Sequence, residues 1–195
     1  MMRLSLSKPI RWLVLGAGII LSTAAQAEPV KVVALGDSNT AGLFVGRGSA
    51  FPALVEASLQ AAGYDVEVTN RGISGDTTGG MLARVDSAVP SGVRVAIVQG
   101  GYNDQRRGVT AARTAANIDA ILARLSARKI KVVLCGFDGA QWSGIARRHG
   151  AVLVPTSTCY DAGSRGFDGL HMNRAGHRIV AARLAPVIQR LLGRR

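Results

Sequence analysis

Histidine and cysteine are scarce in this chain of 195 residues, which holds three histidines and two cysteines. None of them stands at the spacing of a metal-binding motif, so the sequence predicts neither a metal site nor a cofactor. Internal repeats, low-complexity tracts and linker-like stretches are absent too. These absences argue against a metalloprotein and a repeat protein, and the length is typical of a single domain with a sizeable core.

Acidic residues are half as frequent as basic ones, 12 against 24, and the formal net charge is +12. Nucleic acid is one class of partner that suits such a surplus. The basic residues are scattered, however, and no run of them is longer than two residues. We therefore expect no nucleic-acid binding, while affinity for anionic surfaces or substrates stays open.

The first 27 residues have the pattern of a secretory signal peptide. Three basic residues lead into an apolar stretch over residues 12–24, and Ala25-Gln26-Ala27 forms a small-x-small cleavage site. The apolar stretch is short for a membrane span, with an uncleaved anchor as the alternative. We expect a mature single domain of residues 28–195, periplasmic or secreted, with no stable membrane span after cleavage.

Short apolar runs alternate with helical patterns along the rest of the chain. Strands are expected at Val30–Leu35, Val66–Asn70, Val93–Gln99, Ile130–Cys135 and Val152–Pro155. Helices are expected at Pro52–Ala62, Met81–Val89, Thr110–Lys129 and Gln141–Arg148, and after the cap Asn173, where Pro186 should bend or locally unwind the last one. This alternation predicts an α/β fold: a three-layer α/β/α sandwich around a five-stranded parallel sheet in the flavodoxin-like order 2-1-3-4-5.

Cys135 and Cys159 each follow an apolar run. If those runs are neighbouring parallel strands, both thiols lie near the same edge of the sheet. Export would place them where disulfides persist, so a bridge is one interpretation and two unpaired buried thiols are the other.

Four short motifs follow the predicted strands or precede the last helix. They are Gly36-Asp37-Ser38-Asn39, Asn70-Arg71-Gly72, Gly101-Tyr102-Asn103-Asp104 and Asp168-Gly169-Leu170-His171. Parallel sheets keep reactive groups at the carboxyl ends of their strands, so these motifs are expected to meet. Alone, Ser38 could merely cap a helix. Together the motifs supply a nucleophile, oxyanion donors, a base and an orienting acid, as acyl transfer requires.

The four motifs resemble those of the SGNH (GDSL-type) hydrolase superfamily. Residues 73–77, Ile-Ser-Gly-Asp-Thr, resemble its bacterial periplasmic branch of thioesterase I, arylesterase and lysophospholipase enzymes. The chain departs from the family pattern at Met172, where proline is usual, and at Tyr102, where a small residue is common.

The resemblance implies catalytic roles for Ser38, Asp168 and His171. Ser38 would be the nucleophile and His171 its base, held in one tautomer by Asp168. The oxyanion hole would consist of the backbone N–H groups of Ser38 and Gly72 and the side-chain amide of Asn103. Ser74 is the rival nucleophile.

Substrate contacts are expected from Tyr102, Arg71 and Arg106. Arginines at positions 47, 71, 106, 107 and 165 predict a basic rim that favours anionic esters, with ordinary solvated arginines as the alternative. The sequence thus predicts an exported serine esterase acting on a small-molecule, lipid or glycan ester, such as an aryl ester, a lysophospholipid or an acylated glycan. The alternatives are an acyltransferase on the same triad and a non-catalytic periplasmic binding module.

Overall fold

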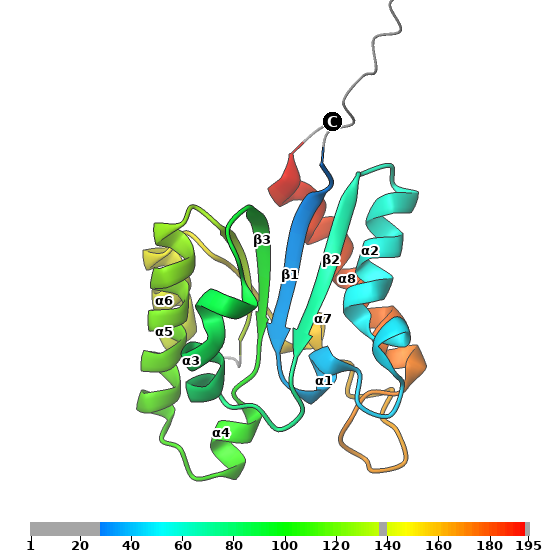
Figure 1. Ribbon diagram of the computed structural model, residues 1–195. Coiled ribbons are helices and arrows are strands. Elements are labelled where there is room, and N and C mark those ends of the chain that lie inside the picture. Colours follow the sequence, from blue (N-terminus) through cyan, green and yellow to red (C-terminus); the bar gives the residue numbers. More distant parts are fainter. Residues whose placement is uncertain (1–27, 137–139, 194–195) are drawn as a thin grey trace, which may run out of the picture.

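The computed structural model describes residues 28–136 and 140–193, which form a three-layer α/β/α sandwich (Figure 1). The predicted signal peptide lies outside the described residues. The central sheet is parallel and has the order β2-β1-β3-β4-β5, so the predicted order is confirmed. Its strands are β1 (Val30–Gly36), β2 (Val66–Gly72), β3 (Val93–Gln99), β4 (Lys131–Cys135) and β5 (Val152–Val154).

Helices cover both faces of the sheet because its central strands are apolar on both sides. In β1, Val32 and Ala34 join the core beneath α2 (Phe51–Ala61) and α8 (Arg174–Leu192). Val33 and Leu35 point to the other face, where α3 (Thr78–Ala88), α5 (Ala111–Ala127) and α6 (Ala140–Arg148) pack. This alternation follows from the two-residue period of a strand. None of the helices in the described ranges is long and apolar enough to span a membrane.

Helix ends differ from the sequence prediction where a side chain caps the backbone. The predicted start of α3 at Met81 is wrong by three residues, because the hydroxyl of Thr77 accepts the amide of Gly80 and begins the helix at Thr78. The expected unwinding at Pro186 does not occur, and α8 is continuous to Leu192. Ala182, whose carbonyl loses its donor to the proline, lies on the exposed side of the helix, where water can replace that donor.

Four short helical segments at the carboxyl edge of the sheet were not expected from periodicity. They are α1 (Ser38–Ala41), the 3₁₀ turn η1 (Arg47–Ser49), α4 (Tyr102–Arg106) and α7 (Thr156–Cys159). All lie at the end toward which the strand arrows point (Figure 1). Three of them, α1, α4 and α7, carry residues of the candidate site.

Candidate active site

The first site element is the sharp turn that leaves β1. Gly36 is required there, because a Cβ atom would lie 2.1 Å from the Oγ1 atom of Thr40 and 2.8 Å from the carbonyl oxygen of Gln99. Asp37 then caps α1 by accepting the amide of Asn39 at 3.0 Å. Ser38 is the first residue of the helix, and its N–H has no partner among the described residues, as expected for a first helical turn.

The loop ahead of α8 brings an imidazole to this serine. Nε2 of His171 lies 2.9 Å from Oγ of Ser38, and Nδ1 of His171 is hydrogen-bonded to the Asp168 carboxylate. The other carboxylate oxygen of Asp168 accepts the backbone amides of Leu170 and His171 at 3.1 and 3.0 Å. The hydrogen bond from His171 is the main cause that lowers the pKa of Asp168 to about 2. Asp168 is therefore ionised near neutral pH and fixes the ring so that Nε2 faces the hydroxyl.

The structure contradicts the expected oxyanion role of Gly72. Its N–H donates to Oδ1 of Asn70 at 2.9 Å, and Gly72 does not line the cavity described below. Gly75 lies on the same turn, lines the cavity, and has an N–H without a partner in the described part of the chain. The sequence therefore predicted correctly that a glycine on this turn faces the cavity, but it did not distinguish Gly75 from Gly72.

Asn103 lies at the cavity as expected, on α4. Its side-chain nitrogen donates one hydrogen to the carbonyl of Asp76 at 2.8 Å, which leaves the second N–H available. The next residue, Asp104, is buried and accepts the amide and the hydroxyl of Thr78 at 2.9 and 2.5 Å. These bonds fix α4 against α3, so the amide of Asn103 has a defined position.

A cavity of about 610 Å³ opens beside Ser38, His171 and Asn103. Tyr102 and Arg106 line it, as predicted, and so does Arg165. Arg71 does not, because it lies on the exposed side at the end of β2, so the cavity gives no support to the prediction that it contacts substrate. No group of histidine, cysteine and acidic side chains suited to a metal ion occurs within residues 28–136 and 140–193.

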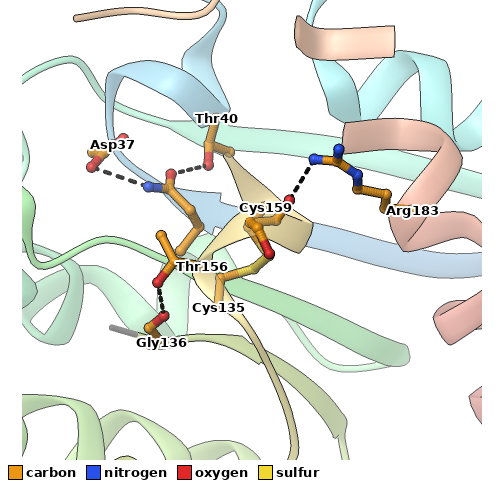
Figure 2. Close-up of a disulfide and its surroundings, with 9 residues drawn as sticks. Asp37, Thr40, Cys135, Gly136, Thr156, Cys159 and Arg183 are labelled. Atoms are coloured by element: carbon orange, nitrogen blue, oxygen red, sulfur yellow. Dashed lines mark hydrogen bonds between the residues drawn. A yellow bond between two sulfur atoms is a disulfide. The ribbon is translucent and has the colours of Figure 1, made fainter. Parts of the chain in front are cut away.

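A disulfide joins Cys135 to Cys159 and forms part of the cavity wall (Figure 2). It connects the end of β4 to the end of α7, with 5.9 Å between the Cα atoms. The hydroxyl of Thr156 donates to the carbonyl of Gly136 at 2.5 Å and adds a second link between the same segments. Arg183 of α8 donates to the carbonyl of Ser157 at 2.6 Å. The loop that carries Asp168 and His171 therefore begins directly after α7, which the disulfide and these two hydrogen bonds hold in place.

A largely buried polar chain behind Ser38 was not predicted from the sequence. Gln99, at the end of β3, accepts the hydroxyl of Thr40 at 2.8 Å and donates to Asp37 at 3.3 Å (Figure 2). Burial is the main cause that raises the pKa of Asp37 to about 6. The one feature of the sequence that could have predicted this chain is Gln99 itself, a polar residue at the end of the apolar strand Val93–Gln99.

The two other histidines lie away from the site. His177 is buried in α8, accepts the amide of Phe51 at 3.1 Å, and has its pKa lowered to about 4 by burial. It is a packing histidine. His149 is hydrogen-bonded to Asp119 at 2.8 Å, an acid from another helix that sequence spacing did not indicate.

The chain matches the GDSL-like lipase/acylhydrolase family over residues 34–179. It belongs to this family. Membership makes the protein an SGNH-type serine hydrolase that acts on ester bonds. The conclusion agrees with the hydroxyl, imidazole and carboxylate found in line at the cavity.

Individual relatives share the family assignment. Esterase TesA of Pseudomonas aeruginosa is 29% identical over 191 residues, covering 89% of this chain and 94% of the relative. An arylesterase of Vibrio mimicus is 34% identical over 129 residues, covering 64% and 62%. Among solved structures, AlinE4, an SGNH-hydrolase family esterase, is 25% identical with a TM-score of 0.65, covering 87% of this chain and all of that one. A TesA structure has the same fold, with a TM-score of 0.74 at 24% identity and coverage of 83% and 99%.

Proposed function

We propose that this protein is an exported esterase that hydrolyses carboxylic or thio esters through an acyl intermediate on Ser38. The observation that carries the proposal is the hydrogen-bonded series from Asp168 through His171 to Ser38 at a cavity. A serine hydroxyl is a weak nucleophile at neutral pH and needs such a base within reach. The N-terminal signal pattern supports export, as does a disulfide, which persists in oxidising compartments.

In the first half of the reaction, Oγ of Ser38 attacks the substrate carbonyl carbon while its proton passes to Nε2 of His171. The tetrahedral oxyanion accepts hydrogen bonds from the N–H groups of Ser38 and Gly75 and from the amide of Asn103. When the bond to the leaving group breaks, the imidazolium returns that proton to the departing oxygen or sulfur. Water then attacks the acyl-enzyme with His171 as base, releasing the acid and restoring the serine. Asp168 remains ionised and stabilises the imidazolium throughout.

The side chains around the cavity support an anionic ester as substrate. Arg106 and Arg165 both line it, and no side-chain carboxylate lies within ion-pair distance of either among the described residues. A carboxylate or phosphate on the substrate would meet this positive field. Salt should lower kcat/KM for an anionic ester more than for a neutral ester of equal chain length, because screening weakens exposed charge pairs. An equal salt response would contradict the preference and leave the hydrolase proposal untouched.

A fluorophosphonate probe tests the nucleophile. We expect it to label the wild-type protein and Ser74→Ala, which removes the neighbouring rival serine, but not Ser38→Ala. Hydrolysis of p-nitrophenyl esters should be lost with the label, and a graded series of acyl chains then measures the depth of the pocket. Equal labelling of Ser38→Ala, or an unlabelled wild type, would contradict the proposal.

A further inference from the structure

The exposed large hydrophobic side chains all lie at one edge of the molecule. Within residues 28–136 and 140–193 they are Phe44, Ile73, Tyr102 and Phe167. Phe44 follows α1, Ile73 follows β2, Tyr102 begins α4 after β3, and Phe167 lies in the loop before α8. These segments gather at the carboxyl ends of the strands, at the bottom of Figure 1. Scattered single apolar residues are ordinary on a surface, but grouping on one edge indicates an interaction site.

Two of these side chains form an aromatic pair beside His171, which lines the cavity. The ring centroids of Phe44 and Phe167 are 4.9 Å apart, and Phe44 contacts the ring of His171 edge-on at 5.5 Å. Phe167 is nevertheless 85% exposed and Phe44 60% exposed. Phe44 also has a φ of +67°, which is unfavourable for any residue with a bulky side chain. An unfavourable backbone conformation at Phe44 thus places a largely exposed aromatic ring beside His171.

Positive charge accompanies this apolar edge. Arg71 is exposed beside Ile73, while Arg47 and Arg107 donate to the backbone carbonyls of Asn70 and Gly75. No side-chain carboxylate of the described residues forms an ion pair with any of these three arginines.

Among the residues that the structure describes, the acids at the same edge are all engaged or buried. Asp76 pairs with Arg84, Asp161 with Arg183 and Asp168 with His171, while Asp37 and Asp104 are buried. The edge therefore combines apolar rings with uncompensated cations.

We propose that this edge adsorbs to an anionic lipid surface. Phe44, Ile73 and Phe167 would enter the interfacial layer, where aromatic and aliphatic side chains are favoured. The arginines would meet lipid phosphates, which attract basic residues at a membrane surface. A second copy of the chain fits this edge poorly, because two positively charged edges would face each other. Adsorption goes beyond the proposed ester hydrolysis and does not require it, and it would turn the cavity toward the lipid.

Vesicle sedimentation tests adsorption with hydrolysis removed. The protein for this experiment is residues 28–195 carrying Ser38→Ala, so that the N-terminal apolar stretch cannot itself enter the lipid. We expect it to sediment with vesicles containing phosphatidylglycerol at least about ten-fold more than with phosphatidylcholine vesicles, and to be released by high salt. Equal sedimentation with both lipids, or with neither, would overturn the proposal.

Variants locate the surface. In the same background, Ile73→Ser with Phe167→Ser should reduce sedimentation by about ten-fold, because apolar burial drives interfacial insertion. Arg71→Gln should reduce it by about five-fold. The matched control is Arg94→Gln, which removes an exposed arginine near the amino end of β3, and it should bind as the parent does.

Further readouts keep the result specific. Thermal unfolding of Ile73→Ser with Phe167→Ser and of Arg71→Gln should match that of the parent, which shows that both variants fold. With Ser38 restored, Ile73→Ser and Arg71→Gln should hydrolyse a soluble ester at the wild-type rate. If Arg94→Gln lost as much binding as Arg71→Gln, net charge alone would explain the binding, and the proposal would be overturned. Self-association that Ile73→Ser with Phe167→Ser abolishes would also overturn it, by assigning the edge to a second copy.

Discussion

The Oδ1 atom of Asn39 accepts the backbone amide of Met172 at 3.2 Å, across 133 residues of sequence. Each partner is the chain neighbour of a catalytic candidate, since Ser38 precedes Asn39 and His171 precedes Met172. The bond therefore links the nucleophile turn to the base loop one residue away from the reacting atoms. A proline, the residue usual in this family at position 172, has no N–H and could not make it.

Removing this link should lower kcat. In Asn39→Leu the side chain keeps its size but loses the acceptor, and we expect kcat on a p-nitrophenyl ester to fall about five-fold, as for about 1 kcal/mol of lost alignment. KM should change little. Asn39→Asp keeps an oxygen at the same place and should retain most of the rate. Equal losses in the two variants would show that the bond does not align the site.

Two glycines on one turn should respond differently to alanine. At Gly72 a Cβ atom would lie 2.2 Å from the backbone nitrogen of Ala41, so Gly72→Ala should lose about 3 kcal/mol of stability or fail to fold. At Gly75 the nearest atom is 3.4 Å away, and the penalty is that of a φ of +77°, about 1–2 kcal/mol. Gly75→Ala should therefore fold but show reduced kcat, because its amide moves. Thermal unfolding beside kcat separates the two, and full activity in Gly75→Ala would contradict its oxyanion role.

Asp37 should make stability depend on pH. Burial raises its pKa from 3.8 to about 6 in the folded chain, so the folded state binds the proton more tightly than the unfolded state does. The resulting stability is fully present below pH 3.8 and is lost as the pH rises through 6, with a total of about 3 kcal/mol. Asp37→Asn cannot ionise, and its stability advantage over wild type should grow between pH 4 and pH 7. Urea denaturation at several pH values measures this, and parallel curves would show that Asp37 does not contribute.

The disulfide should support both stability and the base loop. Cys135 and Cys159 are 24 residues apart in sequence, and closing a loop of that length is worth about 3 kcal/mol. The double variant Cys135→Ser with Cys159→Ser should lose that amount in urea denaturation, and a reductant should weaken wild type but leave the variant unchanged. An unchanged urea midpoint in the double variant would count against the bridge.

Much of the fold could be predicted because hydrophobic patterning reports burial directly. The run Val93–Gln99 is apolar almost throughout, and β3 has the predicted bounds. The short helices α1, α4 and α7 were not predictable in this way, since one turn of helix is too short to display a period. Local hydrogen bonds such as that from Asn39 to Asp37 create them.

Some residues of the candidate site could likewise be predicted from the sequence, and others could not. Ser38, Asp168, His171 and Asn103 follow from residue type and order, because parallel strands bring their carboxyl ends together. The choice between Gly72 and Gly75 did not follow, because it depends on Asn70 having already bound one of the two amides. Arg71 was misplaced for a related reason: a residue at the end of a strand can face the cavity or the solvent, and only the folded turn decides which.

Both ends of the described chain lie on the side of the sheet opposite the cavity. The amide of Val30 donates to the carbonyl of Asp65, at the amino end of β2, and the hydroxyl of Tyr64 reaches the carbonyl of Gly193 at 3.3 Å. The neighbouring start and end are visible at the top of Figure 1. A short peptide could therefore join them to give a circular permutant. Attachment to a solid support through either terminus would leave the catalytic opening directed into solution, so an immobilised enzyme could be made without altering a residue of the site.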